Sequence, residues 1–98
     1  MTIEQKKNGS ALLIALEGRL DTMTAPQLEA ALKEALPGVE ALTFDLEKLD
    51  YIASAGLRML LSAQKTMNQQ GTMKVKNANE MILEIFEVTG FCDILTIE

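Results

Sequence analysis

The 98-residue chain contains no histidine, and this absence excludes more chemistry than any other feature of the sequence. Without histidine there is no Ser-His-Asp triad, no Cys-His dyad, no histidine phosphocarrier and no zinc site ligated by imidazole. The single cysteine, Cys92, forms neither an internal disulfide nor a thiolate metal cage, and it fits a reducing compartment. Most self-contained enzyme chemistries are thereby excluded. We expect no catalytic residue, no metal and no cofactor.

Positive charge and long apolar runs are also scarce. Nine basic residues against 14 acidic ones give a formal net charge of −5, which argues against binding nucleic-acid phosphates or an anionic membrane. The longest apolar run, Ala11 to Leu16, is far shorter than the ~20 residues that span a bilayer. The first residues lack the basic and apolar regions of a signal peptide. These features predict a cytoplasmic protein that contacts neither nucleic acid nor membrane.

Short apolar segments alternate with amphipathic ones, and this order is typical of an α/β fold. The length and the 48% hydrophobic content fit one globular domain over residues 1–98. We expect strands over residues 2–7, 11–16, 41–46 and 73–75, helices over 24–36, 54–70 and 79–88, and either a last strand or a short helix over 94–97. This order predicts a mixed, mostly parallel sheet of four to five strands with helices packed against it.

Local signals refine this prediction. Asn8-Gly9 indicates a hairpin, so the first strand is expected to run antiparallel to the second. The continuous apolar run that follows is typical of a strand covered on both faces. Thr24 is the expected N-cap of the first helix, and Gln27 is expected to complete a capping box. Residues 47–53 are expected to form a loop.

A turn of small residues around Ser54 is the most informative segment. Ala53, Ala55 and Gly56 are small enough to let another surface approach the backbone at the mouth of a helix. The first backbone N–H groups of that helix are unpaired and carry the positive end of its dipole. A phosphate on Ser54 would therefore meet a favourable anion site. The alternative is that Ser54 is simply the N-cap, and the two roles are compatible.

A second loop follows the first central strand, and in a parallel pair it emerges at the same edge of the sheet. Asp21, Thr22 and Ser54 are then expected to share one surface. Asp21 either orients a hydroxyl or caps its turn. Met23 is either an exposed apolar contact or a gap-filling core residue. Arg58, one turn into the helix, either touches a docking partner or pairs with a surface glutamate.

This arrangement resembles the STAS domain of bacterial anti-sigma factor antagonists over nearly the whole chain. Gly18-Arg19-Leu20-Asp21 matches the family's Gly-x-Leu-Asp segment, and Ser54-Ala55-Gly56-Leu57 falls on its Ser-x-Gly-Leu signature. Residues 42–52 resemble the family's approach to the signature, and residues 80–91 resemble its later helix and Gly-Phe segment. Each piece is short, but the ordered set at this length is fairly specific.

The resemblance implies a phosphorylation switch in which the chain performs no catalysis of its own. In the family, an anti-sigma factor with a GHKL-type serine kinase fold phosphorylates the signature serine, which matches Ser54. The unmodified antagonist binds that anti-sigma factor and frees the sigma factor. The phosphorylated form is released, and a PP2C-type phosphatase resets it. We therefore expect a monomeric regulator of sigma-factor-dependent transcription. Its expected partner-binding residues are Asp21, Thr22, Met23, Ala53, Ala55, Gly56, Leu57 and Arg58.

The chain departs from the family pattern at two positions. Ala53 stands where many members carry an aspartate, and this change either weakens kinase recognition or alters the local charge. Ala55 stands where some members carry a second hydroxyl, so Ser54 is the single candidate acceptor in the turn. A STAS accessory subunit of a transporter or lipid-export complex, which binds its partner without phosphorylation, is the alternative function.

Other function classes lack the residues that they need. A hydrolase based on Ser54 or Cys92 would have only a lysine as its base, with no motif around it. A receiver domain phosphorylated on Asp45 or Asp50 would need an acidic pair after an earlier strand, which the chain lacks. A nucleotide site at the sheet edge would need a glycine-rich phosphate loop, whereas Gly56 stands alone.

Overall fold

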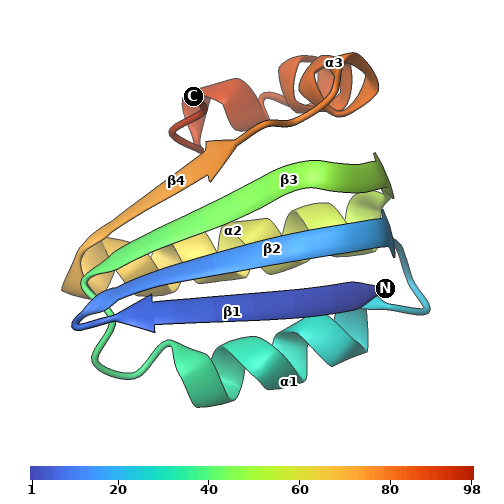
Figure 1. Ribbon diagram of the computed structural model, residues 1–98. Helices are drawn as coiled ribbons and strands as arrows, with labels where there is room; N and C mark the ends of the chain where they lie inside the picture. Colours follow the sequence, from blue (N-terminus) through green and yellow to red (C-terminus); the bar gives the residue numbers. More distant parts are fainter.

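The computed structural model describes residues 1–98, and it shows a mixed sheet flanked by helices (Figure 1). The strands are β1 (Thr2–Asn8), β2 (Ala11–Leu20), β3 (Ala41–Ile52) and β4 (Thr72–Lys76), and the helices are α1 (Ala25–Ala35), α2 (Ser54–Gln70) and α3 (Glu80–Thr89). The strand order is β1-β2-β3-β4. β1 runs antiparallel to β2, and β3 runs parallel to both β2 and β4. The predicted α/β class, the hairpin and the mostly parallel sheet of four strands are confirmed.

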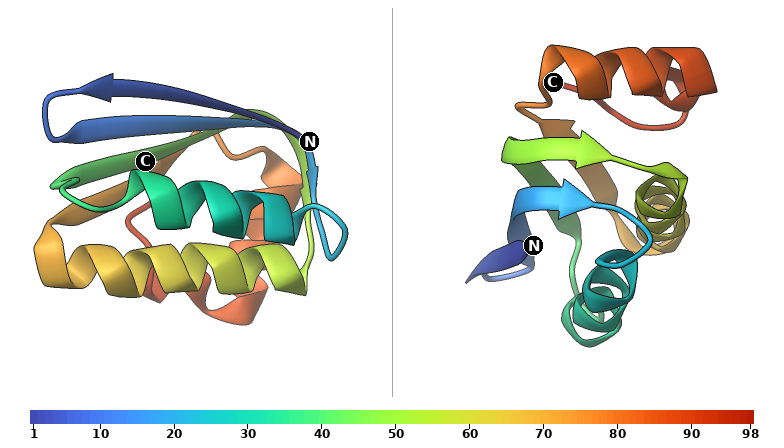
Figure 2. Two further views of the ribbon diagram at one scale, coloured as in Figure 1. Left: turned by 90° about the horizontal axis from the view of Figure 1, so that it is seen from below. Right: turned by 90° about the vertical axis from the view of Figure 1, so that its right-hand side faces the viewer.

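The helices α1 and α2 cover one face of the sheet, and α3 lies beside its β4 edge (Figure 2). Both crossover connections move in the same direction across the sheet, so the same handedness places both helices on the same face. In β2, Leu12 and Ile14 are therefore fully covered, whereas Leu13 and Ala15 point to the other face and are only half-buried. The prediction that this strand is covered on both faces was wrong, because the strand order never reverses.

β3 is longer than the sequence indicated. The predicted strand ended at Leu46, but the observed strand continues to Ile52 through the segment expected to be a loop. Glu47 and Lys48 are both exposed, which breaks the alternation of buried and exposed residues. The pairing of β3 with β2 shifts register at this point, as in a β-bulge, and the strand then continues with Leu49 and Ile52 buried.

The predicted capping box at α1 does not form. Thr24 is the N-cap residue, but its hydroxyl donates to the carbonyl oxygen of Arg19 (2.8 Å) and accepts from the N–H of Asp21 (2.9 Å). The side-chain amide of Gln27 donates to the carbonyl oxygen of Met1 (3.2 Å). Thr24 therefore binds the preceding loop and Gln27 binds the residue before β1, instead of each other's backbone. Thr24 fixes the loop before the helix.

The chain after α3 forms neither of the two elements considered for residues 94–97. A single 3₁₀ turn, Phe91–Asp93, follows Gly90, which ends α3 in the left-handed conformation. Ile97 then makes one parallel bridge with Val75 of β4. The N–H of Val75 donates to the carbonyl oxygen of Thr96 (2.9 Å), and the N–H of Glu98 donates to that of Val75 (2.9 Å). This bridge covers part of the β4 edge.

Asn77, just after β4, binds a carboxylate on the uncovered face of the sheet. Its side-chain amide donates to Oδ1 of Asp45 (3.0 Å), and its backbone adopts the left-handed conformation (φ 62°). This hydrogen bond holds the pKa of Asp45 below its ordinary value of 3.8, although desolvation acts to raise it. The N–H of Glu47 and the charges of Lys76 and Lys48 lower the pKa of Asp45 further.

Replacing Asn77 with glycine is expected to raise the pKa of Asp45 toward 3.8, and glycine keeps the left-handed backbone free of strain. A carboxyl pKa that is depressed in the folded state stabilises the protein above the unfolded-state pKa, and this stability is lost as pH falls through the folded-state pKa. The free energy of unfolding of the wild type should therefore fall more steeply with pH below about 4 than that of Asn77→Gly. NMR titration of Asp45 and urea unfolding at several pH values test this. Equal Asp45 pKa values in both proteins would contradict it.

Candidate functional site

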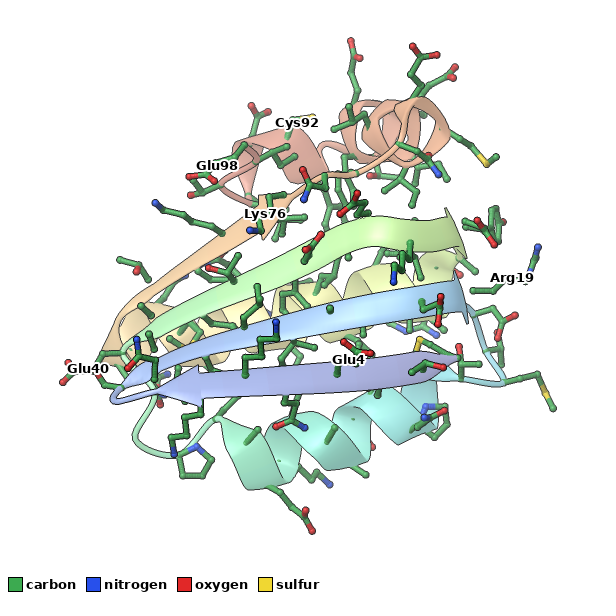
Figure 3. The ribbon with its side chains drawn as sticks, in the orientation of Figure 1. Glu4, Arg19, Glu40, Lys76, Cys92 and Glu98 are labelled. Atoms are coloured by element: carbon green, nitrogen blue, oxygen red, sulfur yellow. The ribbon has the colours of Figure 1, made fainter.

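The candidate site lies where β2 and β3 end side by side. Leu20 pairs with Ile52 in the register of the two strands, and the N–H of Ala53 donates to the carbonyl oxygen of Leu20 (2.9 Å). The strands are parallel, so the loop that begins at Asp21 and the turn that holds Ser54 leave the sheet at the same edge. Arg19, close to the end of β2, marks this edge (Figure 3). The predicted juxtaposition of the two loops is confirmed.

Ser54 is exposed and is the first residue of α2, not its N-cap. The N-cap is Ala53, and no side chain caps this helix. The interpretation of Ser54 as the capping residue was therefore wrong, and its hydroxyl is not engaged at the helix end. The first turn of α2 also contains no acidic residue. An anion placed on Ser54 would be favoured by the helix dipole and by the unpaired N–H groups of that turn.

Small residues let α2 approach the sheet closely behind Ser54. A Cβ atom on Gly56 would lie 2.6 Å from Cγ of Leu20 and 2.8 Å from Cγ1 of Ile52, so only glycine fits without displacing these side chains. Ala55 and Leu57 are buried as well. Of the predicted surface, Gly56 and Leu57 therefore face the domain's own core, whereas Ala55 lines a hollow between α1 and α2. Gly56 and Leu57 support the turn from the side of the sheet, and contact of these three residues with a partner stays a prediction.

Asp21 organises the neighbouring loop. Its Oδ1 accepts hydrogen bonds from the N–H groups of Met23 (3.0 Å) and Thr24 (3.2 Å), so Asp21 caps its own turn. Desolvation acts to raise the pKa of Asp21, but the hydrogen bonds from Thr24 and Met23 and the charge of Arg19 together hold that pKa below its ordinary value. The site therefore already carries a negative charge near neutral pH.

Met23 is the apolar side chain most open to a partner at this edge. Met23 is 86% exposed, which rules out a gap-filling role in the core. Thr22 and Arg58 are exposed too, and Ala53 is half-buried. Between α1 and α2 lies a shallow hollow of about 210 Å³, whose lining includes Thr22 and Arg58. The edge thus combines an exposed apolar side chain, the cations of Arg19 and Arg58, the carboxylate of Asp21 and small polar groups.

Two features of this edge were not anticipated from the sequence. The guanidinium of Arg19 lies 4.7 Å from the ring centroid of Tyr51, and its Nε lies 3.7 Å from Oδ2 of Asp21. The amide of Asn79 donates to the carbonyl oxygen of Leu49 (3.2 Å) while its oxygen caps the first turn of α3, which ties that helix to β3. Both depend on the cross-strand register and on the length of β3, which the sequence did not reveal.

No group of three or more cysteine, aspartate or glutamate side chains converges closely enough to hold a metal ion. No helix combines the length and the apolar character needed to cross a bilayer. The arrangement at the carboxyl edge offers an exposed hydroxyl, a helix N-terminus and a contact surface.

Comparison with known proteins agrees with this geometry. The family model described as "Mlab, STAS domain" matches residues 3–96. The chain belongs to the STAS domain family. The candidate anti-sigma factor antagonist BtrV of Bordetella bronchiseptica is 34% identical over 99% of this chain and 85% of its own length. The anti-sigma-B factor antagonist of Bacillus subtilis is 26% identical over 99% of this chain and 90% of its own.

A solved structure has the same fold as this STAS domain. The Bacillus cell fate determinant SpoIIAA in its phosphorylated form superposes with a TM-score of 0.77 at 18% identity, over 99% of this chain and 91% of that one. At this identity the likeness establishes the fold alone. The predicted single α/β domain of STAS type is thereby confirmed.

Proposed function

We propose that this STAS domain is an anti-sigma factor antagonist that works by partner switching. Unmodified, it binds an anti-sigma factor of GHKL-type serine kinase fold, and phosphorylation of Ser54 releases it. The observation that carries the proposal is the position of Ser54: exposed, free of any capping role, and at an edge shared with the Asp21 loop. The sequence relatives that are anti-sigma factor antagonists support the same function.

The surface supports a switch based on charge. A phosphate adds about −1.5 to −2 charge at neutral pH, to a chain whose formal charge is already −5. The added charge arrives at the sheet edge whose other loop carries Met23, an exposed apolar side chain that a partner docking there would cover. Desolvating a phosphate dianion in such an interface is costly unless the partner supplies cations. The same surface therefore accounts for both states: it binds the partner when Ser54 is unmodified and releases the partner when Ser54 carries a phosphate.

In this scheme the chain is a ligand and a substrate, and the catalytic groups belong to its partners. ATP supplies the phosphoryl group: the bond from phosphorus to Oγ of Ser54 forms as the bond to ADP breaks, and the hydroxyl proton passes to the kinase. A PP2C-type phosphatase would hydrolyse the same bond and reset the cycle. We propose that the protein acts as a monomer and that this cycle takes place in the cytoplasm.

Incubation with ATP and a GHKL-type anti-sigma factor kinase from the same genome tests the proposal. Mass spectrometry should locate one phosphate, on Ser54, and Ser54→Ala should remove it completely. Ser62→Ala is the matched control, because Ser62 is an exposed serine on the same helix away from the edge, and it should be labelled normally. Absence of phosphate, or phosphate elsewhere in the wild type, would overturn the switch. Tight binding to a membrane complex that is indifferent to Ser54→Asp would instead favour the accessory-subunit alternative.

A further inference from the structure

Arg58 lies one helical turn after Ser54 and shares its face of α2. Residues four apart in a helix are neighbours on its surface, with Cβ atoms about 5–6 Å apart. Both side chains are exposed. Arg58 is in neither of the structure's two ion pairs, which join Arg19 to Asp21 and Lys74 to Glu98. The surface next to the modifiable hydroxyl therefore holds an arginine without an ionic partner.

The surroundings of Arg58 leave it available to an anion on Ser54. Arg58 lines the hollow between α1 and α2, and Glu29 of α1 is the one carboxylate among the residues that line it. Glu29 is not within ion-pair distance of Arg58. The first turn of α2 contributes no acidic side chain.

We propose that Arg58 is the intramolecular counter-ion of phosphorylated Ser54, an inference that rests on the proposed phosphorylation of that residue. A guanidinium matches phosphate oxygens with two parallel hydrogen bonds. An anion four residues N-terminal to a cation is also the favourable order along a helix, because it agrees with the helix dipole.

This pairing makes release a two-part event. Phosphorylation adds negative charge to the docking surface, and it also withdraws Arg58 from any acidic group of the partner. Part of the phosphate charge is balanced within the domain, so α2 is expected to stay folded in the modified form. The switch would then change what the surface presents without rearranging the fold.

Phosphoserine placed at position 54 during translation, by an expanded genetic code, allows a test that needs no kinase. The ³¹P NMR titration of the phosphate should give a second pKa lower in the wild type than in Arg58→Gln by about 0.2 to 0.4 unit. Arg58→Lys keeps the charge but loses the paired hydrogen bonds, so its pKa should fall between the two. The difference should shrink as salt is added, because the pair is exposed.

Lys65→Gln is the matched control for this titration. Lys65 is an exposed cation on the same helix, about three turns from Ser54, and its loss changes the net charge equally. Its phosphate pKa should equal that of the wild type. Equal pKa values in Arg58→Gln and Lys65→Gln would overturn the pairing and leave the phosphorylation of Ser54 untouched. A kinase that fails to label Ser54 would overturn the proposed function and leave this titration valid.

Discussion

Ser54→Asp is expected to weaken binding to the GHKL-type anti-sigma factor by about 100-fold, which corresponds to about 2.7 kcal/mol. The side chain at position 54 is exposed at the first residue of α2, so a carboxylate there would face the partner directly. It would lie at the sheet edge that also carries the exposed Met23 and the charged Asp21, and it would need desolvation in the complex. Isothermal titration calorimetry with the purified kinase measures the effect.

Ser54→Asn is the control that separates charge from shape in this experiment. Asparagine has nearly the same size as aspartate and carries no charge, so Ser54→Asn should bind within about threefold of the wild type. Ser54→Ala should bind as well as the wild type and should no longer respond to ATP. If aspartate binds as tightly as serine, charge is not the release mechanism. If Ser54→Asn binds the partner as weakly as Ser54→Asp does, the size of the side chain at this position, and not its charge, weakens binding.

Gly71→Ala is expected to destabilise the fold by about 3 kcal/mol, and to lower Tm by more than about 10 °C. Gly71 caps the C-terminal end of α2, and its N–H donates to the carbonyl oxygen of Met67 (2.6 Å). A Cβ atom there would clash with the backbone carbonyl of Glu40, which itself accepts a hydrogen bond from the N–H of Thr72 (2.9 Å). The clash involves backbone at the start of both β3 and β4, so no side-chain movement relieves it.

The conformation of Gly71 makes this prediction discriminating. Its φ of 171° is extended backbone that any residue adopts, so conformational preference alone does not require glycine. Gly38 has the opposite properties: its φ is 83°, and a Cβ atom there would meet nothing within 4 Å. Gly38→Ala should therefore cost only about 1 kcal/mol, from the left-handed conformation. Thermal unfolding of both variants tests the contact, and a larger loss at Gly38 than at Gly71 would show that packing against Glu40 is not the cause.

The sequence predicted the elements whose signals are local, and it failed where the deciding contact is distant. Gly90 follows the helix predicted over 79–88 and ends α3 in a left-handed conformation, which glycine commonly adopts at this position. The extension of β3 past Glu47 and Lys48 depends on a register shift against β2, which no local pattern reveals. The hydroxyl of Thr24 is engaged by the loop before it instead of by α1, because the carbonyl of Arg19 lies within reach only in the folded chain.

The candidate site shows the same division. The predicted parallel pairing of the two central strands indicated that the Asp21 loop and Ser54 share an edge, because topology alone determines which strand ends lie together. The exposure of the individual residues could be determined only in the folded chain. Met23 points outward, whereas Gly56 is packed against the ends of the strands. The stacking of Arg19 on Tyr51 needed the register of β2 and β3 before it could be anticipated.

The direction of β1 has a practical consequence for experiments on this protein. β1 runs antiparallel to β2, so its first residue lies at the same edge as Ser54, where the carbonyl of Met1 accepts a hydrogen bond from Gln27 of α1 (Figure 1). An affinity tag or fluorescent protein fused before Met1 would emerge beside the docking surface and compete with the partner. Cys92 is the sole cysteine, is exposed, and lies on a different part of the molecule from Arg19 (Figure 3). A dye on Cys92 would report partner exchange while leaving that edge open.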